Sequence, residues 1–89
     1  VRLVVAPNPF NPATELRFSH PTAGPASITI HDASGRTIRR LLDRFLPAGT
    51  HTARWNGRDD ADTPVGSGVY FARLRARHGT ADARLVLVR

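Results

Sequence analysis

The sequence contains no cysteine and no methionine among its 89 residues. Without cysteine the fold has neither disulfide bonds nor a thiolate metal site. No apolar run approaches the roughly 20 residues that a membrane-spanning helix needs. The missing starting methionine leads us to expect that residues 1–89 form one domain excised from a larger secreted protein.

Lysine is also absent, so that all 13 basic residues are arginine, and the 7 acidic residues leave a formal charge of +6. A surface of this charge attracts nucleic acid, acidic polysaccharide or anionic lipid headgroups. The arginines are spread along the chain rather than gathered in one segment. This spread favours an Arg-biased composition over a dedicated anion-binding patch.

Short apolar alternations recur about every ten residues, separated by Gly, Pro, Asn and Asp, which predicts an all-β sandwich or barrel. The segment 37–46 also fits helical spacing, but its neighbours favour a strand with a bulge. Seven strands in a chain of this length predict a seven-stranded antiparallel immunoglobulin-like β-sandwich. The expected strands cover residues 3–6, 14–20, 26–32, 37–46, 50–57, 69–77 and 81–89.

Residues 6–14, APNPFNPAT, place three prolines and two asparagines around one phenylalanine. Each proline fixes its own φ and pushes the preceding residue toward an extended conformation. A flexible linker would leave the apolar ring of Phe10 in water, so we expect a stiff corner between the first two strands. The predicted core residues are Phe10, Phe18, Ile28, Ile30, Trp55, Tyr70 and Leu74.

The four histidines show no arrangement typical of catalysis or of metal binding. They lie on different segments without ligand-like spacing, whereas a zinc site needs three or four converging ligands. His20 and His78 are expected at the surface beside turns, while His51 shares a face with Trp55 and is expected to be half-buried. Ser67 lies in VGSGV, which lacks the spacing and the following helix of a nucleophile elbow. The sequence therefore predicts that the protein is not an enzyme.

The polar loop after Trp55 carries the best candidate for a metal site. Oxygen ligands at alternating loop positions can bind calcium, which is abundant outside cells. No distal glutamate follows, however, and short polar side chains in such loops commonly bond their own backbone in Asx-turns. Asx-turns are therefore favoured over a Ca²⁺ cofactor, and no other cofactor is expected. The candidate calcium ligands are Asn56, Asp59, Asp60 and Asp62.

Three arginines alternate along the expected strand 69–77 and therefore share one face of the sheet. Arginines interleaved with aromatic residues on a sheet can bind single-stranded nucleic acid. An ordinary solvated strand face is favoured, with an anionic surface glycan or lipopolysaccharide as the next alternative. The residues of this face are Phe71, Arg73, Arg75 and Arg77, with Arg84 on the following strand.

Four stretches follow one another in a recognisable order: PNPFNPAT, ITIHDASGRTIRRL, LPAGTHTARWNGRDDADTPVGSGVYFARL and the closing RLVLVR. In this order they resemble the immunoglobulin-like C-terminal domain of many exported bacterial proteins. The sequence is similar both to the type IX secretion C-terminal sorting domain and to the immunoglobulin-like domain of the flagellar hook-cap protein. The resemblance covers essentially the whole chain.

The resemblance implies a non-catalytic C-terminal domain that acts in sorting or surface attachment, and that is secreted or held at the outer cell surface after passing the periplasm. Its partners would be proteins of the secretion or assembly machinery. Two alternatives stay open, a structural or assembly module like the hook-cap domain and a carbohydrate-binding accessory module of a secreted hydrolase. The residues that match the family pattern are Pro7, Asn8, Pro9, Asp32, Gly35, Gly68, Val69, Tyr70, Arg84 and Arg89.

Overall fold

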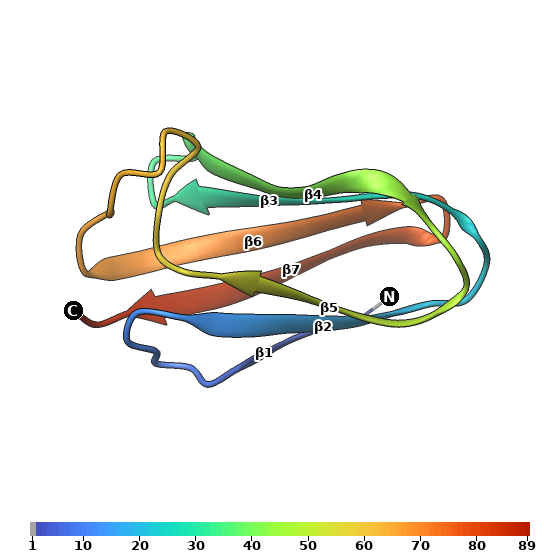
Figure 1. Ribbon diagram of the computed structural model, residues 1–89, viewed down its shortest axis with the longest axis horizontal. Helices are drawn as coiled ribbons and strands as arrows, with labels where there is room; N and C mark the ends of the chain where they lie inside the picture. The colour runs from blue at the N-terminus through green and yellow to red at the C-terminus, as the bar shows by residue number, and fades with distance from the viewer. Residues whose placement is uncertain (1) are drawn as a thin grey trace.

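The computed structural model describes residues 2–89 as two antiparallel β-sheets packed face to face (Figure 1). One sheet has the strand order β1-β2-β5 and the other β4-β3-β6-β7. The predicted seven-stranded antiparallel immunoglobulin-like sandwich is thus confirmed. Residues 2–89 contain no helix long and apolar enough to cross a membrane. The strands are β1 (Leu3–Ala6), β2 (Thr14–His20), β3 (Gly24–Asp32), β4 (Thr37–Leu46), β5 (Gly49–Trp55), β6 (Gly68–Ala76) and β7 (Gly79–Leu87).

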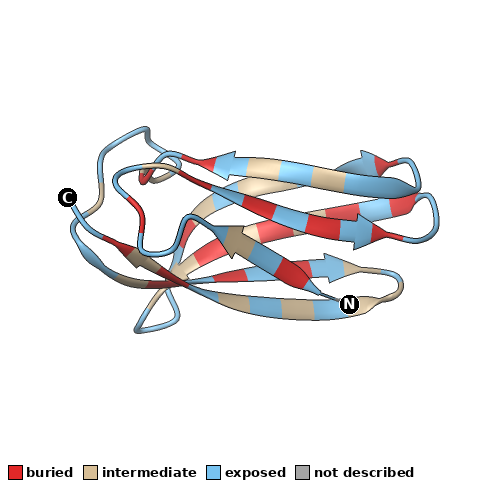
Figure 2. Ribbon diagram, turned by 90° about the horizontal axis from the view of Figure 1, so that it is seen from below, coloured by how far each residue is buried: buried red, intermediate tan, exposed pale blue. Residues whose placement is uncertain are grey.

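Alternating burial explains why these segments form strands with one face turned inward (Figure 2). Along β2 every second side chain is buried, from Thr14 to His20, and those between are exposed. The two inner faces meet in a core that includes all the predicted core residues, each no more than 8% exposed. Trp55 is fully buried there and packs edge-on against Tyr70, with ring centroids 5.3 Å apart. The tryptophan therefore joins the two sheets without help from a disulfide.

The ambiguous segment 37–46 is strand β4, and its pairing with β3 is irregular, as predicted. Ile28 lies opposite Leu42 whereas Thr29 lies opposite Arg40, so that Leu41 is an extra residue in β4. A second register shift occurs two residues further along β3, between Ile30 and His31. Extra residues on one strand break the two-residue alternation. This is why the apolar positions of β4 imitate helical spacing.

Four strands begin earlier than the sequence predicts, β5 and β6 by one residue and β3 and β7 by two. β3 starts at Gly24 rather than at residue 26, so that Pro25 lies within a strand and pairs with Phe45 of β4. A proline is tolerated there because it stands at the beginning of the strand, before the ladder with β6 starts at Ala26. Likewise, β7 starts at Gly79 rather than at residue 81, which shortens the preceding turn.

Chain segments outside the strands close both open sides of the sandwich near one end. After β1 has paired with β2, the chain crosses over, and Phe10 pairs in parallel with Leu87 of β7. On the other side, Asp60 donates its N–H to the carbonyl of Ile38, and its carboxylate accepts the N–H of Arg40. Both outer strands of the four-stranded sheet are thereby partly covered, which limits pairing with other chains.

Candidate functional site

The residues that match the family pattern come together at one end of the sandwich, although they are spread over the whole sequence. Strand register places them there: Asp32 pairs with Tyr70, and Leu87 lies opposite both Gly68 and Phe10. The C-terminus and the β5–β6 loop, residues 56–67, lie at the same end, on the left of Figure 1. We call this the motif end, and it comprises residues 7–12, 32–36, 56–70 and 84–89.

Asn8 and Phe10 attach the N-terminal crossing to the last strand. The Nδ2 group of Asn8 donates to the carbonyl of Arg84 at 2.8 Å, and its Oδ1 accepts the N–H of Val86 at 2.9 Å. Phe10 continues this ladder, since its N–H donates to Val86 and its carbonyl accepts the N–H of Val88. The predicted corner is confirmed, and it also covers the edge of β7, which no local sequence pattern indicates.

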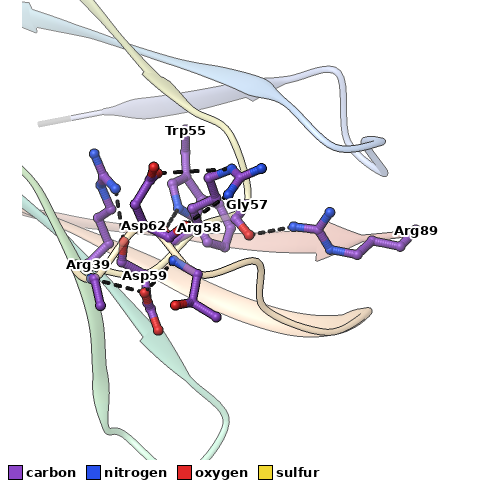
Figure 3. A network of polar contacts seen from close by, with 9 residues as sticks. Arg39, Trp55, Gly57, Arg58, Asp59, Asp62 and Arg89 are labelled. Carbon is purple, nitrogen blue, oxygen red and sulfur yellow. Dashed lines mark hydrogen bonds and ion pairs between the residues drawn. The ribbon is translucent and has the colours of Figure 1, made fainter.

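Two core aromatic residues hold the β5–β6 loop by their polar atoms. The indole N–H of Trp55 donates to the carbonyl of Arg58 at 2.9 Å (Figure 3), and the hydroxyl of Tyr70 donates to the carbonyl of Gly66 at 2.7 Å. Burial raises the pKa of the Tyr70 phenol above its usual range, which further favours the protonated hydroxyl that donates this bond. Each ring fills the core and anchors the loop with its polar edge.

Arg89 holds the same loop from the C-terminal side (Figure 3). Its guanidinium donates to the carbonyls of Gly57 and Val65, and its backbone N–H donates to the Ser67 hydroxyl at 2.8 Å. Gly57 has a φ of +73°, a left-handed conformation that favours glycine, and a Cβ added there would lie 3.1 Å from the carbonyl oxygen of Pro12. A recognition role for Arg89 stays a prediction, while its observed contacts stabilise the loop.

The candidate calcium ligands of the loop bond mostly to the protein itself. Asp59 Oδ1 accepts two backbone N–H groups of its own loop at 3.0 and 2.9 Å, which confirms the predicted Asx-turn. The carboxylate of Asp60 accepts a backbone N–H of β4, and Asp62 forms an ion pair with Arg58 at 4.0 Å. Asn56 is exposed. Over residues 2–89, no three His, Asp or Glu side chains are grouped as a shared metal ion would require.

Asp32 and Gly35 build the turn between β3 and β4. Asp32 Oδ1 accepts the hydroxyl of Ser34 at 2.6 Å and the N–H groups of Ser34 and Arg36, both at 3.0 Å. The Ser34 hydroxyl holds the pKa of the Asp32 carboxyl below its usual range, and the N–H of Arg36 adds to this effect. Gly35 has a φ of +91°, which the turn requires. The two residues thus fix the path of the chain at the motif end.

The outer face of β6 is less basic than the sequence indicates. Arg73 lies opposite Asp82 of β7, and its Nε donates to the Asp82 carboxylate at 2.8 Å. This hydrogen bond lowers the pKa of Asp82 and raises the pKa of Arg73. Asp82 is therefore the acidic neighbour of this strand face. Its charge offsets one of the arginines on which an anion or nucleic-acid surface would rest.

The exposed aromatic rings lie far apart. Phe45 is 67% exposed and Phe71 is 40% exposed. Both are cross-strand neighbours of β3, Phe45 at Pro25 and Phe71 at His31. Positions 25 and 31 are separated by about 20 Å along a strand. The two rings therefore do not form a common platform on which a sugar could stack.

His20 is buried, which corrects the prediction that it lies at the surface. It is only 1% exposed because it continues the inward alternation of Leu16 and Phe18, a signal that the sequence did contain. Its Nδ1 lies 3.1 Å from Nε2 of His78, although the two residues are 58 positions apart. His51 is half-buried, as predicted. The contact between His20 and His78 depends on how the two sheets pack, so no local pattern reveals it.

Comparison with protein families matches residues 10–80 to the FlgD Ig-like domain. The chain is also similar to the basal-body rod modification protein FlgD of Salmonella typhimurium, with 37% identity over 57 residues. The matched segment is 64% of this chain and 25% of that protein. The chain therefore spans about a quarter of the length of this curated relative.

Two solved structures from Porphyromonas gingivalis share the fold. PorU matches with a TM-score of 0.74 and 17% identity, over 97% of this chain and 9% of the PorU chain. PorZ, described as an essential surface component of the type IX secretion system, matches with a TM-score of 0.66 and 25% identity, over 98% of this chain and 11% of its own. The resemblance to immunoglobulin-like domains of exported proteins is thus confirmed. The chain belongs to the FlgD Ig-like domain family.

Proposed function

We propose that this domain is a non-catalytic C-terminal module that directs a larger bacterial protein through the periplasm to the outer cell surface. Proteins of a type IX-like secretion machinery would be its partners. The observation that carries the proposal is the convergence of the family-pattern residues at the motif end. The similarity to PorZ, at 25% identity over 98% of the chain, gives the proposal independent support.

Recognition of a folded surface is most effective when that surface is held in one conformation before the partner arrives. Asn8 is bound to the backbone of β7, and the neighbouring loop is bound by Trp55, Tyr70 and Arg89. Arg84 is exposed on the outer face of β7, where it can contact a partner without contributing to the core. The proposed mechanism is therefore docking of a preformed surface, with no chemical step.

A reporter fusion tests this function. Residues 1–89 are placed after a soluble reporter in a bacterium with a type IX secretion system, and the exported fraction of the reporter is measured. The wild-type domain is expected to bring the reporter to the cell surface. Arg84→Ala is expected to lower the exported fraction while the domain stays folded, as checked by circular dichroism.

Arg17→Ala provides the matched control, because Arg17 is an exposed arginine on β2, in the other sheet. Its export is expected to equal that of the wild type. Retention of the wild-type fusion in the periplasm would contradict the sorting function. Equal losses for Arg84→Ala and Arg17→Ala would contradict the assignment of recognition to the motif end.

The family match and the 37% identity to FlgD favour a second candidate, an assembly module that holds protein partners. The matching segment of Salmonella typhimurium FlgD can be replaced by this domain and the chimera tested for swimming in soft agar. Restored motility would favour assembly. A non-motile strain that contains the chimera as a stable protein would speak against it.

A further inference from the structure

The formal charge of the protein is distributed unevenly between its two ends. The motif end contains four arginines and four aspartates, so the whole formal charge of +6 lies on the remaining residues. The opposite end of the sandwich is on the right of Figure 1 and is formed by segments 19–27, 44–51 and 76–79, which contain no Asp or Glu. We call it the basic end, and the proposed sorting function makes no use of it.

Four exposed arginines surround the basic end. Arg44 and Arg75 stand in the last three residues of β4 and β6, Arg77 directly follows β6, and Arg2 directly precedes β1, which begins at this end. Within residues 2–89 none of the four forms an ion pair with an acidic side chain. Their guanidinium groups therefore remain available to an anionic partner.

The basic end also exposes an aromatic ring. Phe45 follows Arg44 in β4, is 67% exposed and pairs with the exposed Pro25 of β3. A soluble anion gains nothing from an apolar ring, whereas the headgroup layer of a membrane accommodates aromatic rings and the apolar stems of arginines together. The exposed residues of the two nearest turns carry no charge: Pro21, Thr22, Ala23, Pro47 and Ala48.

We propose that the basic end binds the surface of a membrane that contains anionic phospholipids. The guanidinium groups donate to lipid phosphates, and the ring of Phe45 enters the headgroup layer. Arg75 and Arg77 border a hollow of about 320 Å³, which gives a headgroup room between them. Three residues of a strand span about 10 Å, which is about the Debye length at 0.1 M salt, so the arginines of β4 and β6 all lie within reach of the surface charge.

Two acidic residues lie just outside the basic end. Asp82 is paired with Arg73, but Asp43 lines the same hollow as Arg77 and forms no ion pair within residues 2–89. Asp43 therefore opposes the binding of phosphate. The longest extent of the molecule is 36 Å, and the motif end lies at the other end of it. A domain bound in this way stands upright on the membrane and keeps the motif end accessible to proteins.

Cosedimentation with vesicles tests the basic end. The 89-residue chain is mixed with vesicles of phosphatidylcholine alone, or of phosphatidylcholine and phosphatidylglycerol in equal parts. It is expected to sediment only with the vesicles that contain phosphatidylglycerol. NaCl at about 1 M, where the Debye length is about 3 Å, is expected to release it. Arg44→Ser/Arg77→Ser is expected to weaken binding at least tenfold, since each arginine near such a surface contributes about fivefold.

Two single variants separate the ring from the charges. Phe45→Ser is expected to weaken vesicle binding severalfold, and Asp43→Asn is expected to strengthen it by up to about fivefold. Both side chains are exposed, so both variants should fold. Soluble polyglutamate serves as an acidic chain without a lipid surface. Tighter binding to polyglutamate than to the vesicles, unchanged in Phe45→Ser, would overturn the proposal in favour of an acidic protein partner.

Arg36→Ser/Arg58→Ser is the matched control, because it removes two exposed arginines from the motif end and the same total charge from the protein. Its affinity for the vesicles is expected to stay within twofold of the wild type. Equal losses in the two double variants would overturn the proposal, because only the net charge would then matter. Equal sedimentation with both kinds of vesicle, or none with either, would overturn it as well. The reporter assay is independent of these outcomes, because Arg84 lies at the motif end.

Discussion

The side chain of Asn8 takes the place of a backbone neighbour for Val86, since its Oδ1 accepts the Val86 N–H at 2.9 Å. The two residues are 78 positions apart, and the other half of the carboxamide donates to the carbonyl of Arg84. One asparagine therefore satisfies a donor and an acceptor on the edge of the last strand. An edge satisfied in this way is a poor template for pairing with other chains.

Asn8→Ala is expected to lower the free energy of unfolding by about 1–2 kcal/mol, because it leaves one donor and one acceptor of β7 without a protein partner. Urea denaturation measures the loss, and hydrogen exchange of the Val86 amide locates it. Asn8→Asp keeps the acceptor but removes the donor, so the Val86 amide should stay protected. An unchanged exchange rate of the Val86 amide in Asn8→Ala would show that its hydrogen bond to the Asn8 side chain does not form in solution.

Phe10→Ala is expected to destabilise the domain by about 3 kcal/mol or more, as is usual for a buried aromatic side chain. Phe10 is 2% exposed, and its ring centroid lies 5.6 Å from that of Trp55. Phe45→Ala is the control, because Phe45 is 67% exposed. Thermal and urea unfolding measure both variants. A loss below about 1 kcal/mol for Phe10→Ala would mean that the ring is not in the core.

Arg89→Ala is expected to free the β5–β6 loop, because the guanidinium binds two of its carbonyls. The loss of these two hydrogen bonds, one exposed and one partly buried, should cost about 1 kcal/mol. Hydrogen exchange should accelerate at Val65, whose N–H donates to Gly57 within the loop. Arg44→Ala, at an exposed arginine of β4, should leave this exchange unchanged. Equal exchange in all three proteins would refute the role of Arg89.

Stability is expected to fall in acid partly because of Asp82. Arg73 lowers the folded-state pKa of Asp82, so the ionised carboxylate stabilises the fold above the unfolded pKa of about 3.9. That contribution disappears as the pH falls through the lower folded-state pKa. Urea midpoints measured from pH 6 down to pH 2 should therefore decline less in Asp82→Asn than in the wild type. Asp43→Asn removes an equal charge from β4 and should decline as the wild type does.

The strands and most of the core could be predicted from the sequence, because a half-buried strand carries the two-residue alternation in its own residues. Phe18, Ile28 and Leu74 were identified in this way, and all are buried. The corner at Phe10 could be predicted because an apolar ring in a stiff, proline-rich segment is more stable in the core than in water. The bulges of β4 obscured its alternation, so its strand character had to be inferred from its neighbours.

The contacts of the two ends could not be predicted from local patterns. Asn8 meets β7 across 78 positions, and His20 meets His78 across 58. Each contact forms only when separate strands have packed, so neither leaves a period or a motif in the sequence. The convergence of Asp32, Tyr70 and Arg89 at the motif end likewise follows from strand register rather than from spacing along the chain.

The central claim is that secretion machinery recognises the folded motif end rather than a linear segment of the chain. The most direct test measures the exported fraction of the reporter fused to the wild type, to Asn8→Ala and to Phe10→Ala, and compares it with the folded fraction of each domain at the growth temperature. The exported fraction is predicted to follow the folded fraction through the series. Full export of a fusion whose domain is unfolded would contradict the account.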